Sequence, residues 1–153
     1  HDLLNLGSRG VTAVGTTSLR TLESLYWFGY QLKLKNKFHD KLYHIDQWLP
    51  YQEVKPLAVR SSLLGILIHM SNRGLEFIDF STSLLIVPGY KFKIVDRLIT
   101  NFHQPGSTLL LLVAAFIGDD WKKVYDYALN NDFRFLSYGD SSLLIRNTNM
   151  DEA

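Results

Sequence analysis

The sequence contains no cysteine among its 153 residues, which excludes disulfide frameworks, thiolate zinc sites and cysteine nucleophiles. Lysine and arginine (16) nearly balance aspartate and glutamate (15), so an arginine-rich mode of binding polyanions is excluded, although a local basic patch is not. The longest uninterrupted apolar run, residues 109–117, is much shorter than the roughly 20 residues that cross a bilayer. With 46% hydrophobic residues, the composition indicates a globular, cytoplasmic domain with a packed core.

Hydrophobic periodicity predicts an α/β fold, in which a sheet is flanked by helices, over a single domain at 1–153. Thr16 or Thr17 can cap the first helix and Gly29 is placed to end it. Residues 29–55 have no regular pattern and carry several lysines, so they are expected to form an irregular basic excursion. The predicted strands are 11–14, 84–87, 90–95, 133–137 and 142–145, and the predicted helices are 19–28, 56–73, 108–117 and 120–129.

Three polar loops are candidates for a functional site. The first, Gly15 to Ser18, joins a strand to a helix, where backbone N–H groups and hydroxyls can bind an anion or a polar ligand. A plain capping turn would use the same residues, and both interpretations remain open. Its glycine spacing fits neither the phosphate-loop nor the dinucleotide-binding motif.

The second candidate loop, 100–108, contains His103, whose imidazole titrates near neutrality and can serve as a general acid or base. A histidine that only holds the loop by hydrogen bonding is the alternative. The third loop, 137–140, offers a hydroxyl, a phenol and a carboxylate, which suit ligand recognition and a tight turn equally well. The five histidines lack the spacing of a metal site, so no metal is expected.

Three long motifs in this order resemble those of the S-adenosylmethionine:tRNA ribosyltransferase-isomerase family of queuosine biosynthesis. The first is Ala13 to Ser24, AVGTTSLRTLES. The second runs from PGYKFKIVD at 88–96 through LITNFH at 98–103 to STLL at 107–110. The third is FRFLSYGD at 133–140. On these motifs the resemblance covers residues 10–28 and 84–146, whereas 29–83 is longer and more basic than the family pattern.

The resemblance implies an enzyme that transfers and rearranges the ribosyl group of S-adenosylmethionine onto 7-aminomethyl-7-deazaguanine in tRNA, giving epoxyqueuosine-tRNA without a metal. Because the motifs begin close to the start of the chain, we expect it to be a C-terminal portion that lacks the family's N-terminal part and its β-barrel domain. Such a portion is expected to be inactive alone, since reacting groups must be held within a fraction of an ångström.

Within that chemistry His103 is the predicted acid or base, with Asp140 and Glu23 as alternatives. The residues predicted to bind the donor, S-adenosylmethionine, are Gly15, Thr16, Thr17, Ser18, Arg20, Asn101, Ser107, Thr108 and Tyr138.

Two other functions stay open. A non-catalytic tRNA-binding module would place lysines on phosphates and an aromatic ring on a splayed base, and its candidates are Lys33, Lys35, Lys37, Lys41, Tyr43 and Trp48. A metabolic enzyme would instead use the Gly15 loop for a small phosphorylated ligand.

Overall fold

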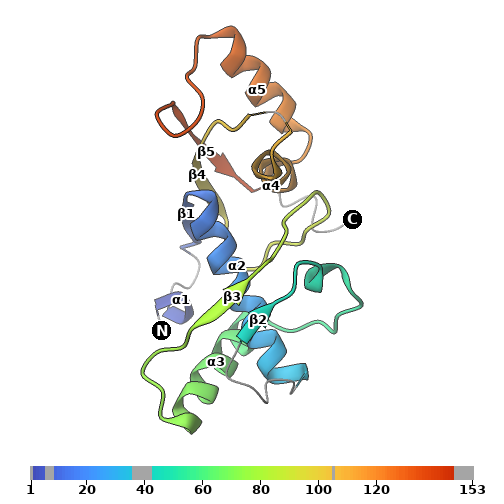
Figure 1. Ribbon diagram of the computed structural model, residues 1–153, viewed down its shortest axis with the longest axis vertical. Coiled ribbons are helices and arrows are strands. Elements are labelled where there is room, and N and C mark those ends of the chain that lie inside the picture. The colour runs from blue at the N-terminus through green and yellow to red at the C-terminus, as the bar shows by residue number, and fades with distance from the viewer. Residues whose placement is uncertain (1, 6–8, 36–42, 105, 147–153) are drawn as a thin grey trace. The chain divides into compact units, whose positions relative to one another are not determined.

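The computed structural model describes residues 2–5, 9–35, 43–104 and 106–146. These residues form two compact units, of which the first contains 20–85 and the beginning of the chain, and the second contains 9–19 and 86 onward. Each unit holds both helices and strands, so the mixed α/β class is confirmed (Figure 1). That the whole chain is a single domain stays a prediction.

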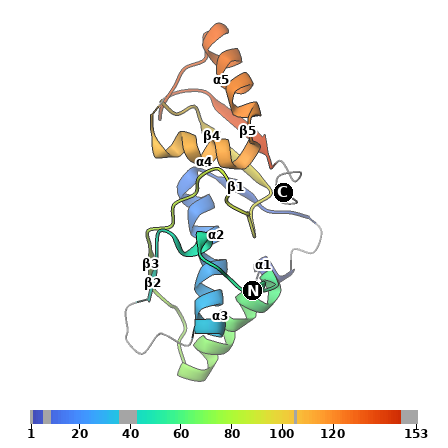
Figure 2. The same cartoon turned by 90° about the vertical axis from the view of Figure 1, so that its right-hand side faces the viewer.

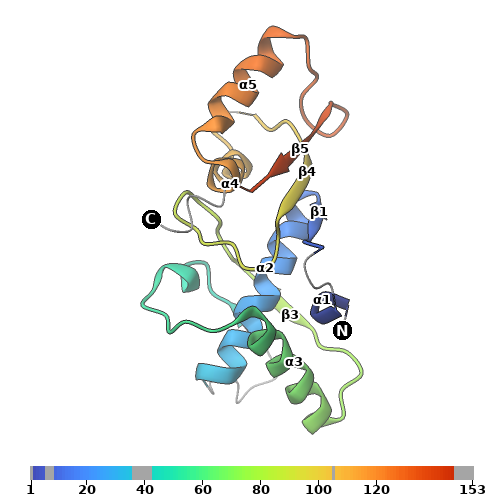
Figure 3. The ribbon, with the colours of Figure 1, turned by 180° about the vertical axis from the view of Figure 1, so that it is seen from behind.

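The second unit is built around a three-stranded sheet in the order β1, β4, β5 (Figure 3). Strand β1 (Thr12–Val14) runs parallel to β4 (Arg97–Asn101), and β5 (Ser141–Ile145) runs antiparallel to β4. Helix α4 (Thr108–Ile117) packs against β5, and α5 (Asp120–Asn130) packs against α4. The sheet is thus flanked by helices, as the sequence predicts.

The two faces of this sheet differ in burial. Ala13, Leu98 and Leu144 occupy one row across the three strands and are buried. The alternate residues Val14 and Leu143 remain more than half exposed, because a strand turns successive side chains to opposite faces. The covered face receives α4, whose apolar sequence is buried along most of its length as expected.

The first unit contains the long helices α2 (Thr16–Tyr30), which begins in the second unit, and α3 (Val59–Arg73) (Figure 2). Its strands β2 (Tyr43–Ile45) and β3 (Phe80–Thr82) pair in parallel, and Phe28 of α2 stacks on Phe80 at 5.1 Å between ring centres. A four-residue helix, α1 (Asp2–Asn5), opens the chain, a π-helical segment, Gln31–Lys35, continues α2, and a 3₁₀ turn, Leu49–Tyr51, follows β2.

Gly29 does not end the first helix, contrary to the sequence prediction, since α2 continues to Tyr30. A Cβ atom added at Gly29 would overlap the backbone carbonyl of Ser62 on α3. The Ser62 hydroxyl also donates a 2.5 Å hydrogen bond to the Tyr26 carbonyl oxygen of α2. Glycine is therefore required at position 29 for the close approach of two helices rather than for a helix end.

The strand predictions are partly wrong. Residues 84–87, 90–95 and 133–137, all within the described part of the chain, are extended or bent segments without strand pairing. Their apolar alternation instead reflects burial, since Leu84, Ile86, Phe92 and Ile94 are less than 10% exposed. Strands β2, β3 and β4 were not predicted, whereas the turn at Pro88-Gly89 is confirmed by a hydrogen bond from Tyr90 N to Val87 O.

The predicted excursion at 29–55 holds regular structure as well as loop. It contains the end of α2, the π-helical segment and β2, and residues 36–42 lie outside the described residues. Among the described residues, no helix is long and apolar enough to cross a membrane.

Candidate active site at one edge of the sheet

The three polar loops meet at one edge of the β1-β4-β5 sheet. Because β1 and β4 are parallel, with Val14 opposite Ile99, their carboxyl ends lie at the same edge. The Gly15 amide donates a 2.8 Å hydrogen bond to the Ile99 carbonyl oxygen and so joins the first loop to β4. Strand β5 begins at this edge, where Ser141 is opposite Asn101. The carboxyl edge of parallel strands is where α/β sheets usually bind ligands.

Gly15, rather than Thr16 or Thr17, stands at the start of α2. Its φ of +87° is a left-handed conformation that favours glycine, and its carbonyl accepts the first helical hydrogen bond, from Leu19 N at 3.1 Å. Thr16 is then the first helical residue and is 9% exposed, while Thr17 and Ser18 are exposed. The first turn of a helix carries N–H groups without an intrahelical acceptor, so this loop has the geometry of an anion or carboxylate site.

Arg20 and Glu23 continue along α2, where the chain belongs to the other compact unit. Glu23 is fully buried. The Nε atom of Arg20 is buried and has no hydrogen-bond partner among the described residues. That these two residues belong to the site stays a prediction.

His103 lies immediately beyond β4 and is held at both its ring and its backbone. Its Nε2 atom is 3.0 Å from the Thr100 hydroxyl, and its backbone N–H donates to the Tyr125 hydroxyl oxygen at 3.0 Å. Burial lowers the pKa of His103 below its usual value, so the imidazole is neutral at neutral pH. A neutral, oriented imidazole is suited to accept a proton.

The residues beside His103 fasten the second loop to the third. The Asn101 side-chain amide donates to the carbonyl oxygens of Leu136 at 2.9 Å and Gly139 at 3.3 Å. Phe102 is buried among the rings of Tyr125, Phe133 and Phe135, each within 5.5 Å between ring centres. Asn101, predicted to bind the donor, thus has structural partners for its amide hydrogens.

The third loop is closed by a clamp between Arg134 and Asp140. One Asp140 carboxylate oxygen accepts from the Arg134 backbone N–H at 2.8 Å and the other from its guanidinium at 3.2 Å. The bonds from Arg134 hold the pKa of Asp140 below its usual range. A carboxylate held ionised in this way is a poor proton donor at neutral pH, which favours His103 over Asp140 as the acid or base. The predicted turn at 138–140 is confirmed, since Gly139 N donates to Leu136 O.

Two further predicted residues lie at the start of α4. Ser107 caps this helix, with its hydroxyl accepting from Leu110 N at 3.4 Å and donating to Gln104 O at 2.9 Å. Thr108 is exposed at the first helical position. Asp119 occupies the cap position of α5, but its side chain makes no capping hydrogen bond.

Several residues that build this edge were not predicted as site residues. Thr100 positions the imidazole, Tyr125 positions its backbone, and Arg134 closes the third loop. Of these three residues only Thr100 could have been found from the sequence, because it is a polar residue three positions before His103. Among the described residues, no group of three His, Asp or Glu side chains could hold a metal ion.

The residues proposed for a tRNA-binding module are only partly exposed. Lys33 is exposed and Trp48 is 53% exposed, but Tyr43 is 8% exposed and its hydroxyl lies 2.8 Å from His69 Nε2. A buried ring cannot stack on a base, so that prediction for Tyr43 is wrong. Lys37 and Lys41 lie outside the described residues.

The chain belongs to the family described as "Queuosine biosynthesis protein", because it matches the model of that family over residues 4–144. The matched range spans 29–83 as well as the three motifs, and that this segment is longer and more basic than the family pattern stays a prediction. The recognition from the three motifs is confirmed.

Individual relatives have a more specific name. A protein of Nitrosomonas eutropha named S-adenosylmethionine:tRNA ribosyltransferase-isomerase is 37% identical over 139 residues, which cover 90% of this chain and 28% of the relative. A protein of the same name from Rickettsia bellii is 38% identical over 139 residues, covering 90% and 27%. The crystal structure of an S-adenosylmethionine tRNA ribosyltransferase from Thermotoga maritima is similar, with a TM-score of 0.55 and 32% identity over 94% of this chain and 36% of that one. The chain thus spans about a third of the length of the relatives it matches.

Proposed function

We propose that this chain contributes the β1-β4-β5 edge to an S-adenosylmethionine:tRNA ribosyltransferase-isomerase. The enzyme would transfer and rearrange the ribosyl group of S-adenosylmethionine onto 7-aminomethyl-7-deazaguanine in tRNA, releasing adenine and methionine and forming epoxyqueuosine-tRNA. Membership of the family supports the proposal, as do the names of the relatives. A tRNA substrate also supports a cytoplasmic location.

The single observation that carries the proposal is the meeting of the three family motifs at one sheet edge. Gly15 of the first motif is hydrogen bonded to Ile99 of the second, and Asn101 of the second is hydrogen bonded to Leu136 and Gly139 of the third. Motifs separated by more than 100 residues in the sequence are thereby brought to one place. Packing alone does not require polar loops from three separate segments to share an edge.

Each part of the edge has a proposed role. The N-terminal turn of α2, from Gly15 to Ser18, binds the donor through backbone N–H groups and hydroxyls. His103, neutral because burial lowers its pKa, removes the proton from the acidic carbon beside the sulfonium, and once protonated it can return that proton to a leaving group. Arg20, Thr108 and Glu23 remain further proposed site residues, while Asn101, Ser107 and Asp140 hold the loops in place.

The test is His103→Ala, assayed by adenine release in single turnover at saturating tRNA. The substitution is made in a full-length family enzyme in which this chain replaces the matching segment, and the 153-residue chain alone is assayed in parallel. Loss of an acid or base typically lowers the rate by about 10²–10⁴-fold, so we expect a fall of that size with little change in donor affinity. Ser107→Ala, at the cap of α4, is the control for loop disturbance.

Three results would contradict the proposal in different ways. A His103→Ala rate within about threefold of the parent rate would make the histidine structural. Binding of tRNA without any adenine release by the parent chimera would favour the non-catalytic module. Adenine release by the isolated chain near the rate of the intact enzyme would show that this edge is sufficient alone, against our expectation that it is inactive.

A further inference from the structure

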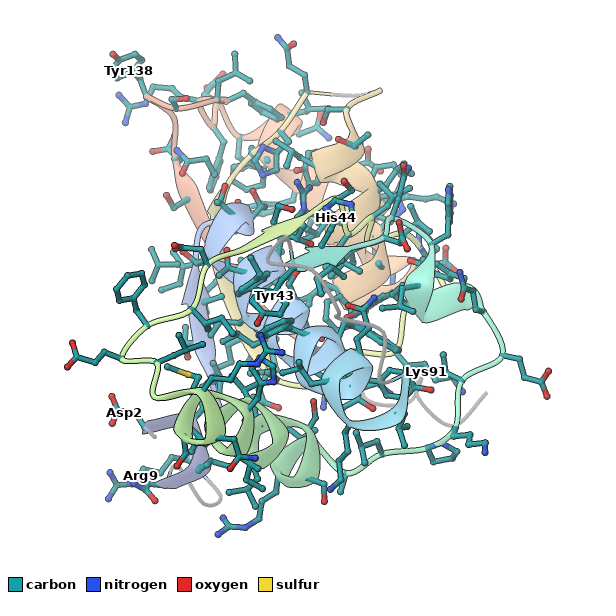
Figure 4. The ribbon with its side chains drawn as sticks, turned by 60° about the horizontal axis from the view of Figure 1, so that its bottom comes forward. Asp2, Arg9, Tyr43, His44, Lys91 and Tyr138 are labelled. Atoms are coloured by element: carbon teal, nitrogen blue, oxygen red, sulfur yellow. The ribbon has the colours of Figure 1, made fainter. Side chains whose placement is uncertain are left out.

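Tyr138 is displayed at the tip of the third loop rather than packed. Its exposed fraction is 97%, the highest among the large hydrophobic and aromatic side chains of the described residues that exceed one third exposure. The ring points away from the ribbon, on the loop that leads into the start of β5 (Figure 4). A side chain in this position contributes nothing to the core, and its apolar area remains in water.

The backbone on both sides of Tyr138 is nevertheless firmly held. The Asn101 amide binds the carbonyl oxygens of Leu136 and Gly139, which lie two residues before and one residue after the tyrosine. Leu136 N donates to Phe102 O at 2.9 Å, and its φ of +68° is unusual for a residue with a side chain. These contacts anchor the loop to β4 and to the buried Phe102.

The far side of the loop is equally constrained. Asp140 N donates to Arg134 O at 2.8 Å, in addition to the clamp between the two side chains. A Cβ atom added at Gly139 would overlap the Arg134 backbone, so the turn is as tight as glycine permits. Little beyond the two χ angles of Tyr138 remains to be ordered when a partner binds, which keeps the entropic cost of binding low.

We propose that Tyr138 is a stacking platform for an unpaired base of the tRNA, held in place by Asn101 and the Arg134–Asp140 clamp. This inference rests on the proposed function, which makes tRNA the acceptor. Proteins recognise single-stranded RNA loops largely by stacking splayed bases on aromatic side chains, and the wobble nucleotide lies in such a loop. Arg134, with 74% of its side chain exposed, places a cation on the same loop.

The exposure of Tyr138 also indicates which of the two substrates it contacts, the RNA acceptor or the S-adenosylmethionine donor. A small-molecule site buries about 70–90% of the ligand surface, which requires walls around it. A ring at the tip of a turn, almost fully exposed, offers one flat face instead. That face matches a nucleobase of a large substrate better than S-adenosylmethionine, so the structure reassigns Tyr138 from the donor, as the sequence suggested, to the RNA.

The test measures binding of a fluorescein-labelled RNA hairpin, carrying an anticodon stem and loop, to the 153-residue chain by fluorescence anisotropy. The variants are Tyr138→Ala and Tyr138→Phe. Tyr127→Ala is the matched control, because Tyr127 is also an exposed tyrosine, at 62%, but lies on α5. Losing one stacked base should raise the Kd about 5- to 150-fold for Tyr138→Ala. The Phe variant keeps the ring face and should bind within about twofold of the parent, as should the Tyr127 control.

Thermal unfolding and donor binding complete the experiment. The melting temperature of Tyr138→Ala should equal that of the parent chain, since an exposed side chain contributes little to stability. Equal RNA affinity of Tyr138→Ala and the parent would overturn the inference, and so would a parent chain that does not bind the hairpin. A lower melting temperature together with unchanged RNA affinity would make Tyr138 a packing residue for protein. Weaker binding of S-adenosylmethionine together with unchanged RNA affinity would return it to the donor.

These outcomes are separate from those for the proposed function. If RNA binding depends on Tyr138 but the chimeric enzyme releases no adenine, the platform stands and the catalytic proposal fails. If the chimeric enzyme releases adenine but RNA affinity does not change in Tyr138→Ala, the catalytic proposal stands and the stacking platform fails.

Discussion

Replacing Gly29 by alanine should destabilise the first unit strongly, although the substitution favours a helix in isolation. An added Cβ would overlap the carbonyl oxygen and carbon of Ser62, which are backbone atoms and cannot rotate away. Helices α2 and α3 would have to separate, and the buried hydrogen bond from the Ser62 hydroxyl to Tyr26 O would stretch or break.

The magnitude follows from three opposing contributions. Overpacking costs about 1–3 kcal/mol. Loss of a buried hydrogen bond costs about 1–3 kcal/mol more. Replacing glycine inside a helix returns about 1 kcal/mol. We therefore expect Gly29→Ala to lower the free energy of unfolding by about 3 kcal/mol.

Gly65 provides a matched control on the facing helix. A Cβ at this position would lie 3.5 Å from the Gly29 carbonyl oxygen and 3.8 Å from Lys33 Cβ, which are ordinary contacts. Gly65→Ala should therefore be neutral or stabilise by up to about 1 kcal/mol. Urea unfolding followed by tryptophan fluorescence reports on this unit, because Trp27 is 2% exposed. If both variants unfold at the same urea concentration as the parent, the close approach of α2 and α3 is refuted.

Two further predictions concern the charged residues. Asp140, whose pKa Arg134 lowers, stabilises its loop above the ordinary carboxylate pKa of about 4 and loses this contribution as pH falls through the lowered value. Amide exchange at Arg134 should therefore quicken with acid in the parent beyond the intrinsic trend but not in Asp140→Asn, and identical profiles would exclude the clamp. Changing Lys33, Lys35 and Lys37 together to alanine should weaken tRNA binding and flatten its dependence on salt, because fewer counterions are released. An unchanged salt slope would mean that these lysines only face solvent.

The sequence predicted the three loops of the candidate edge and two of the strands that carry it, β1 and β5, but not β4. Gly15, His103 and Asp140 were recognised as loop residues from short-range signals, namely a strand followed by a glycine, a polar run before a helix, and a turn. These signals are local, so they do not depend on how distant segments of the chain pair or pack. Their meeting at one edge depends on the parallel pairing of β1 with β4, which residues 85 positions apart make and no local pattern reveals.

The wrong strand predictions share one cause, which is that apolar alternation indicates burial and not hydrogen bonding between strands. Tyr90, Phe92 and Ile94 are buried as the pattern requires, yet their segment pairs with no strand among the described residues. Gly29 looked like a helix end for a similar reason, since a glycine needed for a helix–helix contact and one needed for a turn are identical in sequence. Both errors concern contacts between segments distant in the chain.

Several polar side chains at the edge already have hydrogen-bond partners within the protein. Asn101 uses its amide hydrogens on the third loop, Ser107 uses its hydroxyl on α4, and Asp140 uses both carboxylate oxygens on Arg134. Polar groups already satisfied in this way bind substrate only by giving up these bonds. His103 uses Nε2 on the Thr100 hydroxyl, but no described residue bonds its second ring nitrogen. That nitrogen and the N-terminal turn of α2 are therefore the groups best placed for the proposed reaction, and the exposed ring of Tyr138 is best placed for the proposed RNA contact.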